Sequence, residues 1–149
     1  MIKIIGGSLL DATEDILCHQ VNCQGVMGSG IALALRNNYP NLYESYYNFC
    51  VYCNKVHALG GAQFVEQDDG HIIANLFGQY HYGRENILYT DYTELEVAFV
   101  RLRNYAIENN LSIAMPYGIG CGLANGDWQI VYKMIERVFY NIDVTLYKI

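Results

Sequence analysis

The chain has 149 residues, a formal net charge of −6, and a composition that is 52% hydrophobic and 16% charged. This balance is typical of a globular protein and differs from that of disordered or fibrous chains, and the length suits one domain spanning 1–149. The negative charge argues against a surface for duplex nucleic acid, which needs a basic face. No apolar run reaches the roughly 18 residues of a membrane span. Because residues 1–7 lack the flanks of a signal peptide, we expect a cytoplasmic protein.

Predicted strands and helices alternate along the chain. Short apolar runs predict strands, and longer periodic stretches predict helices. The expected order is strands 2–5 and 16–21, helices 31–38 and 41–53, strands 63–66 and 71–77, helix 92–108, strand 113–116, helix 128–139 and strand 144–147. Asp91 and Glu94 have the spacing of a capping box for the third helix. The hairpin-like pair around the turn 67–70 implies a mixed sheet, so we predict an α/β layered sandwich.

Two glycine-rich loops each follow a predicted strand and precede a predicted helix. The first runs over 22–32 and contains Gly25, Gly28 and Gly30, and the second runs over 117–127. Glycine lets a ligand approach the backbone closely, and the first N–H groups of a helix are unpaired and partly positive. Each loop is therefore a candidate anion site, most often for phosphate. Two such loops can meet at the carboxyl ends of adjacent strands.

The loops disfavour two common nucleotide sites. Neither contains Lys, so neither is a Walker A loop, and a triphosphate with Mg²⁺ is not expected. The first loop reads G-x-x-G-x-G, whereas the dinucleotide fingerprint is G-x-G-x-x-G with an acidic residue further on. A nicotinamide-dependent oxidoreductase is therefore disfavoured. A double cradle of backbone groups suits a diphosphate flanked by two sugars.

Cysteine and tyrosine are the other unusual residues. Cys50 and Cys53 form a lone C-x-x-C within the predicted helix 41–53, so reduced thiols are expected ahead of a metal or redox site. The 14 tyrosines are expected mainly in packing, and those at helical spacing in 41–53 in the core. One or two tyrosines remain candidates for stacking on a base.

The two loops resemble those of the macrodomain family. The stretch 19–32 reads HQVNCQGVMGSGIA, 116–123 reads PYGIGCGL, and the terminal strand 144–147 reads VTLY. These stretches are similar in order and spacing to the branch that contains the terminal ADP-ribose protein glycohydrolase and its bacterial and phage relatives. The resemblance covers nearly the whole chain and implies a three-layer α/β/α sandwich that binds ADP-ribose.

The resemblance also implies where ADP-ribose lies. The diphosphate would lie between the two glycine loops, the distal ribose near Asn22, Gly30 and Cys121, and the adenine near 7–9. Many macrodomains have an Asp where this chain has Ser8, so adenine recognition is expected to differ. The implied binding residues are Ser8, Leu9, Gln20, Asn22, Met27, Gly28, Ser29, Gly30, Ile31, Ala32, Pro116, Gly118, Ile119, Gly120, Cys121, Gly122 and Leu123.

The catalytic residues of this branch are not all present. The vertebrate glycohydrolase uses a Lys and an Asp, whose positions are occupied here by Gln79 and Ala124. Neither side chain can act as an amine nucleophile or a carboxylate base, so a lysyl covalent route is not expected. The candidates are Asn22, to orient the distal ribose or water, and Asp127 or His19, to assist proton transfer. Asp127 has the alternative role of capping the last helix, and His19 that of a buried, hydrogen-bonded residue.

The function implied is that of an ADP-ribosyl hydrolase. It would remove mono-ADP-ribose from an ester to Asp or Glu of a modified protein, or from related adducts, by attack of water on the anomeric or acyl carbon. Two alternatives stay open. The chain is a non-enzymatic ADP-ribose reader, which the lost Lys and Asp favour, or an ADP-ribose 1″-phosphate phosphatase, since a His matching His19 is catalytic in a related yeast macrodomain.

The polar loop 78–90 adds three further candidates. His81, Tyr82 and Arg84 are expected either to cover the distal ribose or to contact solvent. The ligand is expected to be ADP-ribose, with no cofactor and no metal, and the partner an ADP-ribosylated protein or nucleic acid. No heptad pattern or exposed apolar helix face is evident, so a monomer is expected.

Overall fold

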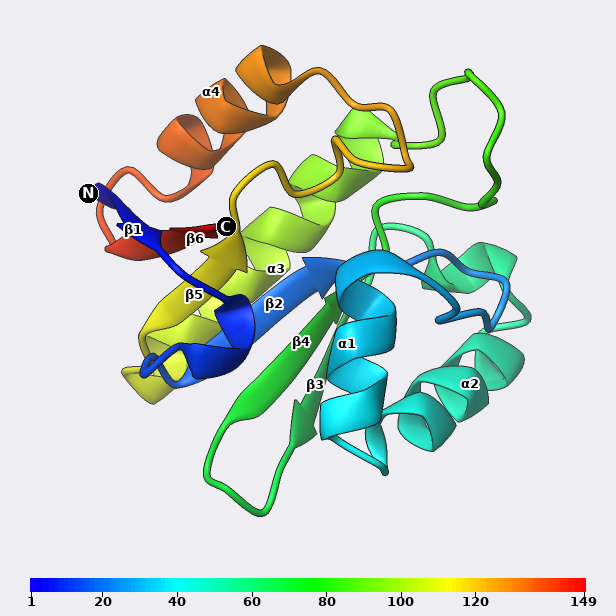
Figure 1. Ribbon diagram of the computed structural model, residues 1–149, viewed down its shortest axis with the longest axis horizontal. Coiled ribbons are helices and arrows are strands. Elements are labelled where there is room, and N and C mark those ends of the chain that lie inside the picture. Colours follow the sequence, from blue (N-terminus) through cyan, green and yellow to red (C-terminus); the bar gives the residue numbers. More distant parts are fainter.

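The computed structural model describes residues 1–149 (Figure 1). Every predicted strand and helix is present, with boundaries within one residue of the prediction: β1 Ile2–Gly6, β2 Ile16–Gln20, α1 Gly30–Asn38, α2 Leu42–Tyr52, β3 Ala62–Glu66, β4 Ile72–Leu76, α3 Tyr92–Asn109, β5 Ile113–Pro116, α4 Trp128–Val138 and β6 Val144–Lys148. Two short 3₁₀ helices, Leu9–Asp11 and Val56–Ala58, were not predicted. None of the helices has both the length and the apolar character that crossing a membrane requires.

The six strands form one mixed sheet in the order β1-β6-β5-β2-β4-β3. Only β3 runs antiparallel to its neighbour, which confirms the hairpin predicted around 67–70. The other four pairings are parallel. Because β2 lies between β4 and β5, the carboxyl ends of these three strands share one edge of the sheet. The loops that follow them therefore meet at that edge.

Helices cover both faces of the sheet. Alternation along β2 sends Ile16 and Cys18 into a core shared with α3 and α4, and Leu17 into a core shared with α1 and α2. Figure 1 shows α1 in front of the sheet and α3 behind it. The molecule is therefore the three-layer sandwich expected from the resemblance.

Candidate functional site

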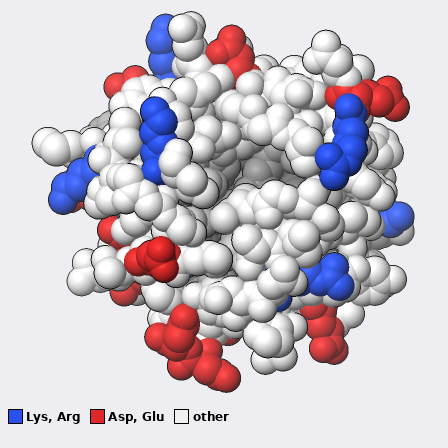
Figure 2. Space-filling model, viewed as in Figure 1, with Lys and Arg blue, Asp and Glu red and all other residues white.

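A cavity of about 630 Å³ lies between the two glycine loops at the carboxyl ends of β2 and β5. Figure 2 shows this face hollowed near its centre, with charged side chains of both signs set back from the hollow. Four segments build the wall: the end of β2, the first glycine loop, the loop after β4 and the second glycine loop. The lining residues are Gln20, Val21, Asn22, Val26, Gly28, Ser29, Gly30, Ile31, Ala32, Gln79, Tyr82, Gly83, Arg84, Pro116, Tyr117, Gly118, Ile119, Gly120, Gly122, Leu123 and Ala124.

Most of the expected ADP-ribose residues line this cavity, and four do not. Leu9 lines a smaller adjoining hollow of about 290 Å³ that shares Ile31, Pro116 and Tyr117 with the main cavity. Ser8 accepts a hydrogen bond from the backbone of the short 3₁₀ helix that it precedes. Met27 is 1% exposed and belongs to the core beside α1 and α2. The Cys121 thiol donates to Ile119 O at 3.4 Å and lies outside the lining. The side chains of Ser8, Met27 and Cys121 therefore support the walls of the cavity rather than forming them.

The two glycine loops face each other across the cavity and form a cradle whose surface is made of backbone groups. Helix α1 begins at Gly30, whose φ is +60°, and Ser29 makes no side-chain cap. The first N–H groups of α1 therefore have no partner within the helix. In the facing loop, Gly118 and Gly120 have φ of +81° and +77°. A Cβ on Gly120 would lie 3.0 Å from the Gln20 amide oxygen, so a side chain there is disfavoured by both backbone strain and crowding.

Tyrosines of α2 hold the first glycine loop in place. The Tyr46 hydroxyl accepts a hydrogen bond from Val26 N at 3.2 Å and lies 2.7 Å from Asn22 O, to which it donates. Tyr43 donates to Gly25 O at 2.8 Å. Tyr46 is buried, as predicted for the aromatics of this helix, whereas the prediction is wrong for Tyr47 and Tyr52, which are 47% and 89% exposed. The Tyr46 hydroxyl, however, supports the loop, a role that the helical spacing did not reveal and that only the choice of Tyr over Phe could have indicated.

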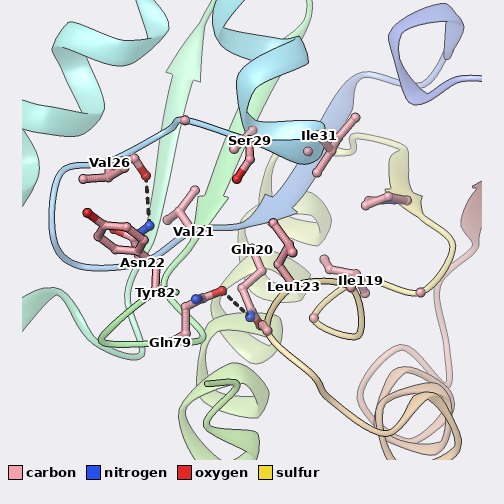
Figure 3. Close-up of a pocket in the computed structure, with 18 of the residues that line it drawn as sticks. Gln20, Val21, Asn22, Val26, Ser29, Ile31, Gln79, Tyr82, Ile119 and Leu123 are labelled. Atoms are coloured by element: carbon pink, nitrogen blue, oxygen red, sulfur yellow. Dashed lines mark hydrogen bonds between the residues drawn. The ribbon is translucent and has the colours of Figure 1, made fainter. Parts of the chain in front are cut away.

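Asn22 lines the cavity, but much of its amide is already engaged. Its Nδ2 donates to Val26 O at 2.9 Å (Figure 3), and its Oδ1 accepts from Gln24 N at 2.9 Å. The side chain fixes the turn that begins the loop and is only 8% exposed. One Nδ2 hydrogen remains for a ligand.

His19 and Asp127 lie outside the cavity lining. His19 is fully buried, with Nε2 2.6 Å from Asn75 Oδ1, and burial lowers the pKa of His19 to about 4. Asp127 is exposed and caps α4 by accepting from Gln129 N at 2.9 Å. Strand alternation puts His19 on the opposite face from the cavity-lining Gln20. The contacts of both residues are those of the structural alternatives, a buried hydrogen-bonded His and a helix cap.

A polar chain crosses the floor of the cavity. Gln20 Nε2 donates to Gln79 Oε1 and to Thr90 Oγ1, both at 2.9 Å, and Thr90 Oγ1 donates to Gly120 O at 2.6 Å. Gln79 also donates to His81 O at 2.8 Å. Figure 3 shows Gln20 and Gln79 joined across the floor. This chain ties the second glycine loop to β2, and no sequence pattern had singled out Thr90.

The cavity is nearly free of charge. Arg84 is the one charged side chain in its lining, which contains no Asp, Glu, His or Lys. Of the three loop candidates, Tyr82 and Arg84 line the cavity and His81 does not. The arrangement can bind an anion with backbone N–H groups and orient a sugar with amides. It offers no carboxylate, imidazole or amine to act as a general base.

Comparisons with known proteins agree with this fold. No protein-family model matches the chain. A DNA ADP-ribosyl glycohydrolase of Mycobacterium tuberculosis is 30% identical over 99% of the chain, which spans 42% of that relative. An ADP-ribose 1″-phosphate phosphatase of Scheffersomyces stipitis is 29% identical over the full length of both chains. The solved macrodomain of Mycobacterium tuberculosis DarG superposes with a TM-score of 0.84 at 26% identity, covering 99% of this chain and 97% of that one. The chain belongs to the macrodomain family.

Proposed function

We propose that the chain is a hydrolase that releases ADP-ribose from an adduct. One observation carries the proposal: two backbone cradles, at Gly28–Ala32 and Gly118–Gly122, line a single cavity of about 630 Å³ in which Arg84 is the one charged side chain. A diphosphate between them would accept hydrogen bonds from unpaired N–H groups at the start of α1. The adenosine would extend to the hollow beside Leu9, and the distal ribose toward Asn22.

The proposed reaction is hydrolysis at the anomeric carbon of the distal ribose. Water forms the new C–O bond, the bond from that carbon to the carrier atom breaks, and the carrier takes the proton that water gives up. No cavity side chain is a carboxylate, imidazole or amine, so the contribution of the chain is orientation. Asn22 Nδ2 would hold the ribose or the water, and such positioning can supply about 7–11 kcal/mol of the barrier in the best cases.

The sequence leads us to expect ADP-ribose ester-linked to a protein. The names of the relatives suggest two other groups to which ADP-ribose could be attached. The mycobacterial relative, of which the chain spans about two-fifths, is named for action on DNA, and the yeast relative for action on ADP-ribose 1″-phosphate. Arg84 favours a ligand with an anionic group besides the diphosphate, since it is the only cation of the cavity. A phosphatase acting on the 1″-phosphate is therefore the second candidate.

We further propose that the chain works as a cytoplasmic monomer without a cofactor. Its five cysteines are all free, which suits a reducing compartment. The cavity lining has none of the thiol, imidazole or carboxylate ligands that a catalytic metal prefers.

One assay separates these functions. The purified chain is incubated in parallel with a base-linked ADP-ribosylated oligonucleotide, an ester-linked ADP-ribosylated protein and ADP-ribose 1″-phosphate, and free ADP-ribose and phosphate are measured. Gly120→Glu, which fills the cradle, is the blocked control. Release of ADP-ribose from either adduct, lost in the control, supports the hydrolase. Phosphate release alone establishes the phosphatase, and ADP-ribose binding without any turnover establishes a reader.

A further inference from the structure

The hollow beside Leu9, which the proposed function assigns to the adenosine, is built mainly from apolar and aromatic side chains. It measures about 290 Å³ and adjoins the main cavity, since Ile31, Pro116 and Tyr117 line both. Leu9 is 2% exposed, and the rings of Tyr117 and Tyr147 belong to the lining. A base in this adenosine hollow is therefore bound chiefly by contact with apolar and aromatic surfaces.

No acidic side chain of the adenosine hollow is available to accept a hydrogen bond from an amino group. None of the lining residues is Asp or Glu. Glu14 lies outside the lining and accepts from the Tyr147 hydroxyl at 2.7 Å. The Ser8 hydroxyl oxygen accepts from Leu10 N at 3.1 Å. Both nearby acceptors are therefore already engaged, and no free carboxylate faces an exocyclic amino group such as that of adenine.

The backbone of the hollow offers few further acceptors. Four carbonyl groups of the lining already accept a backbone N–H at 2.9 to 3.1 Å, those of Leu9, Pro116, Tyr147 and Lys148. Ile149, at the rim, is fully exposed, so its oxygen atoms remain in contact with water. The Tyr117 hydroxyl can donate as well as accept, so it does not distinguish an amino group from a carbonyl group.

The one charged side chain of the hollow is a hydrogen-bond donor. Lys148 lines the hollow, is exposed, and makes no ion pair. Its Nζ lies 4.5 Å from the centroid of the Tyr117 ring, and this cation–π contact keeps the ammonium beside the wall of the hollow. An ammonium has three N–H donors and no acceptor. It therefore favours a base whose edge presents a carbonyl oxygen or an unprotonated ring nitrogen.

Purine bases differ in what they present at position 6. Adenine has an amino group, which donates, whereas guanine has a carbonyl oxygen, which accepts, and both have an acceptor at N7. Hypoxanthine has the same carbonyl as guanine and otherwise matches adenine closely. A site that hydrogen-bonds a group rejects an analogue lacking it by roughly 10⁴–10⁵-fold, whereas apolar contact alone distinguishes similar ligands by only roughly 10–200-fold. The adenosine hollow has no group that would reject a 6-oxopurine.

We propose that the adenosine hollow does not select for adenine, so that the cavity also binds analogues of ADP-ribose with a 6-oxopurine base, and that Lys148 determines this preference by donating to the base. The inference rests on the proposed function for the placement of the adenosine. It concerns the end of the ligand opposite the bond that is hydrolysed, so it holds for any group attached to the distal ribose.

The experiment measures binding, so it does not depend on turnover. Calorimetry gives the Kd of the wild type for ADP-ribose and for the analogue in which hypoxanthine replaces adenine. We expect the two Kd values to lie within about tenfold of each other. A preference for adenine greater than this would overturn the proposal. Absence of binding to both ligands would instead contradict the proposed function, so the two failures are distinguishable.

A charge reversal tests the role of Lys148. Lys148→Glu replaces the donor with an acceptor, and we expect the ratio of the Kd for the hypoxanthine analogue to the Kd for ADP-ribose to rise about tenfold. Repulsion between the new carboxylate and the diphosphate affects both ligands equally and cancels from this ratio. Lys133→Glu makes the same charge change at an exposed residue of α4 outside both linings and should leave the ratio unchanged. The same ratio in Lys148→Glu as in Lys133→Glu would contradict the assignment of Lys148.

Discussion

Tyr46 offers the sharpest test of how the site is held together. Tyr46 is fully buried, and its hydroxyl is the one group of α2 that hydrogen-bonds both Val26 N and Asn22 O, at 3.2 and 2.7 Å. In Tyr46→Phe the ring keeps its packing against Phe77, with centroids 5.9 Å apart. The variant then leaves a buried donor and acceptor without this partner, which costs about 1–3 kcal/mol.

We expect this loss to appear both in stability and in binding. Urea unfolding of Tyr46→Phe should give a free energy lower by about 1–3 kcal/mol. If the loosened loop adopts its binding conformation a tenth of the time, calorimetry should show about tenfold weaker ADP-ribose affinity. Tyr105→Phe is the control, because Tyr105 stacks on Phe64 at 3.7 Å and its hydroxyl has no hydrogen bond. A Tyr46→Phe protein as stable and as tight-binding as Tyr105→Phe would refute this account of the loop.

Three further predictions follow from other contacts. Thr90→Val cuts the link to Gly120 O, so ADP-ribose affinity measured by calorimetry should fall several-fold while helix content by circular dichroism is kept; full affinity would show that the polar chain is dispensable. Asp127→Ala should lower the melting temperature through loss of about 1 kcal/mol of capping and leave turnover intact, and a loss of turnover at full ligand affinity would instead give Asp127 a catalytic role. The hydrogen bond from His71 lowers the pKa of Asp69 below its ordinary value of 3.8, so that carboxylate stabilises the fold at higher pH and loses its effect as the pH falls below 3.8. The stability gap between the wild type and Asp69→Asn, followed by urea unfolding against pH, should therefore close in acid, and a constant gap would exclude this contribution.

The sequence was sufficient for the elements and for the backbone cradle, because both depend on local patterns. The strands are apolar runs, and Asp91 caps α3 through Glu94 N at 3.2 Å as its spacing predicted. The roles of polar side chains depend on partners far along the chain. His19 could not be placed without its partner Asn75, which is 56 residues away. Thr90 likewise gains its role only from Gly120, 30 residues away.

The conformation of residues 80–87 was hardest to foresee, because Cys23 N and Asn125 Nδ2, which bind its carbonyl groups, lie far along the chain. Asn125 holds it from the second glycine loop across 40 residues, and does so in a left-handed conformation with φ of +63°. Gln79 was assessed from the sequence only as the loss of a nucleophile. In the structure its amide joins Gln20 to His81, which is a function that Lys could not perform, because Lys has no acceptor.

The order of the strands also determines when the sheet can be completed while the chain is being synthesised. Strand β1 pairs with β6 alone, and Met1 N contacts Asp143, 142 residues further on. While a ribosome is still making the chain, the first strand emerges without a neighbour and waits exposed until residues 144–148 follow it. Strand β6 supplies Tyr147 and Lys148, and the 3₁₀ helix after β1 supplies Leu9, to the hollow beside the cavity. The adenosine end of the site is therefore complete only once β6 has been made and has paired with β1 and β5.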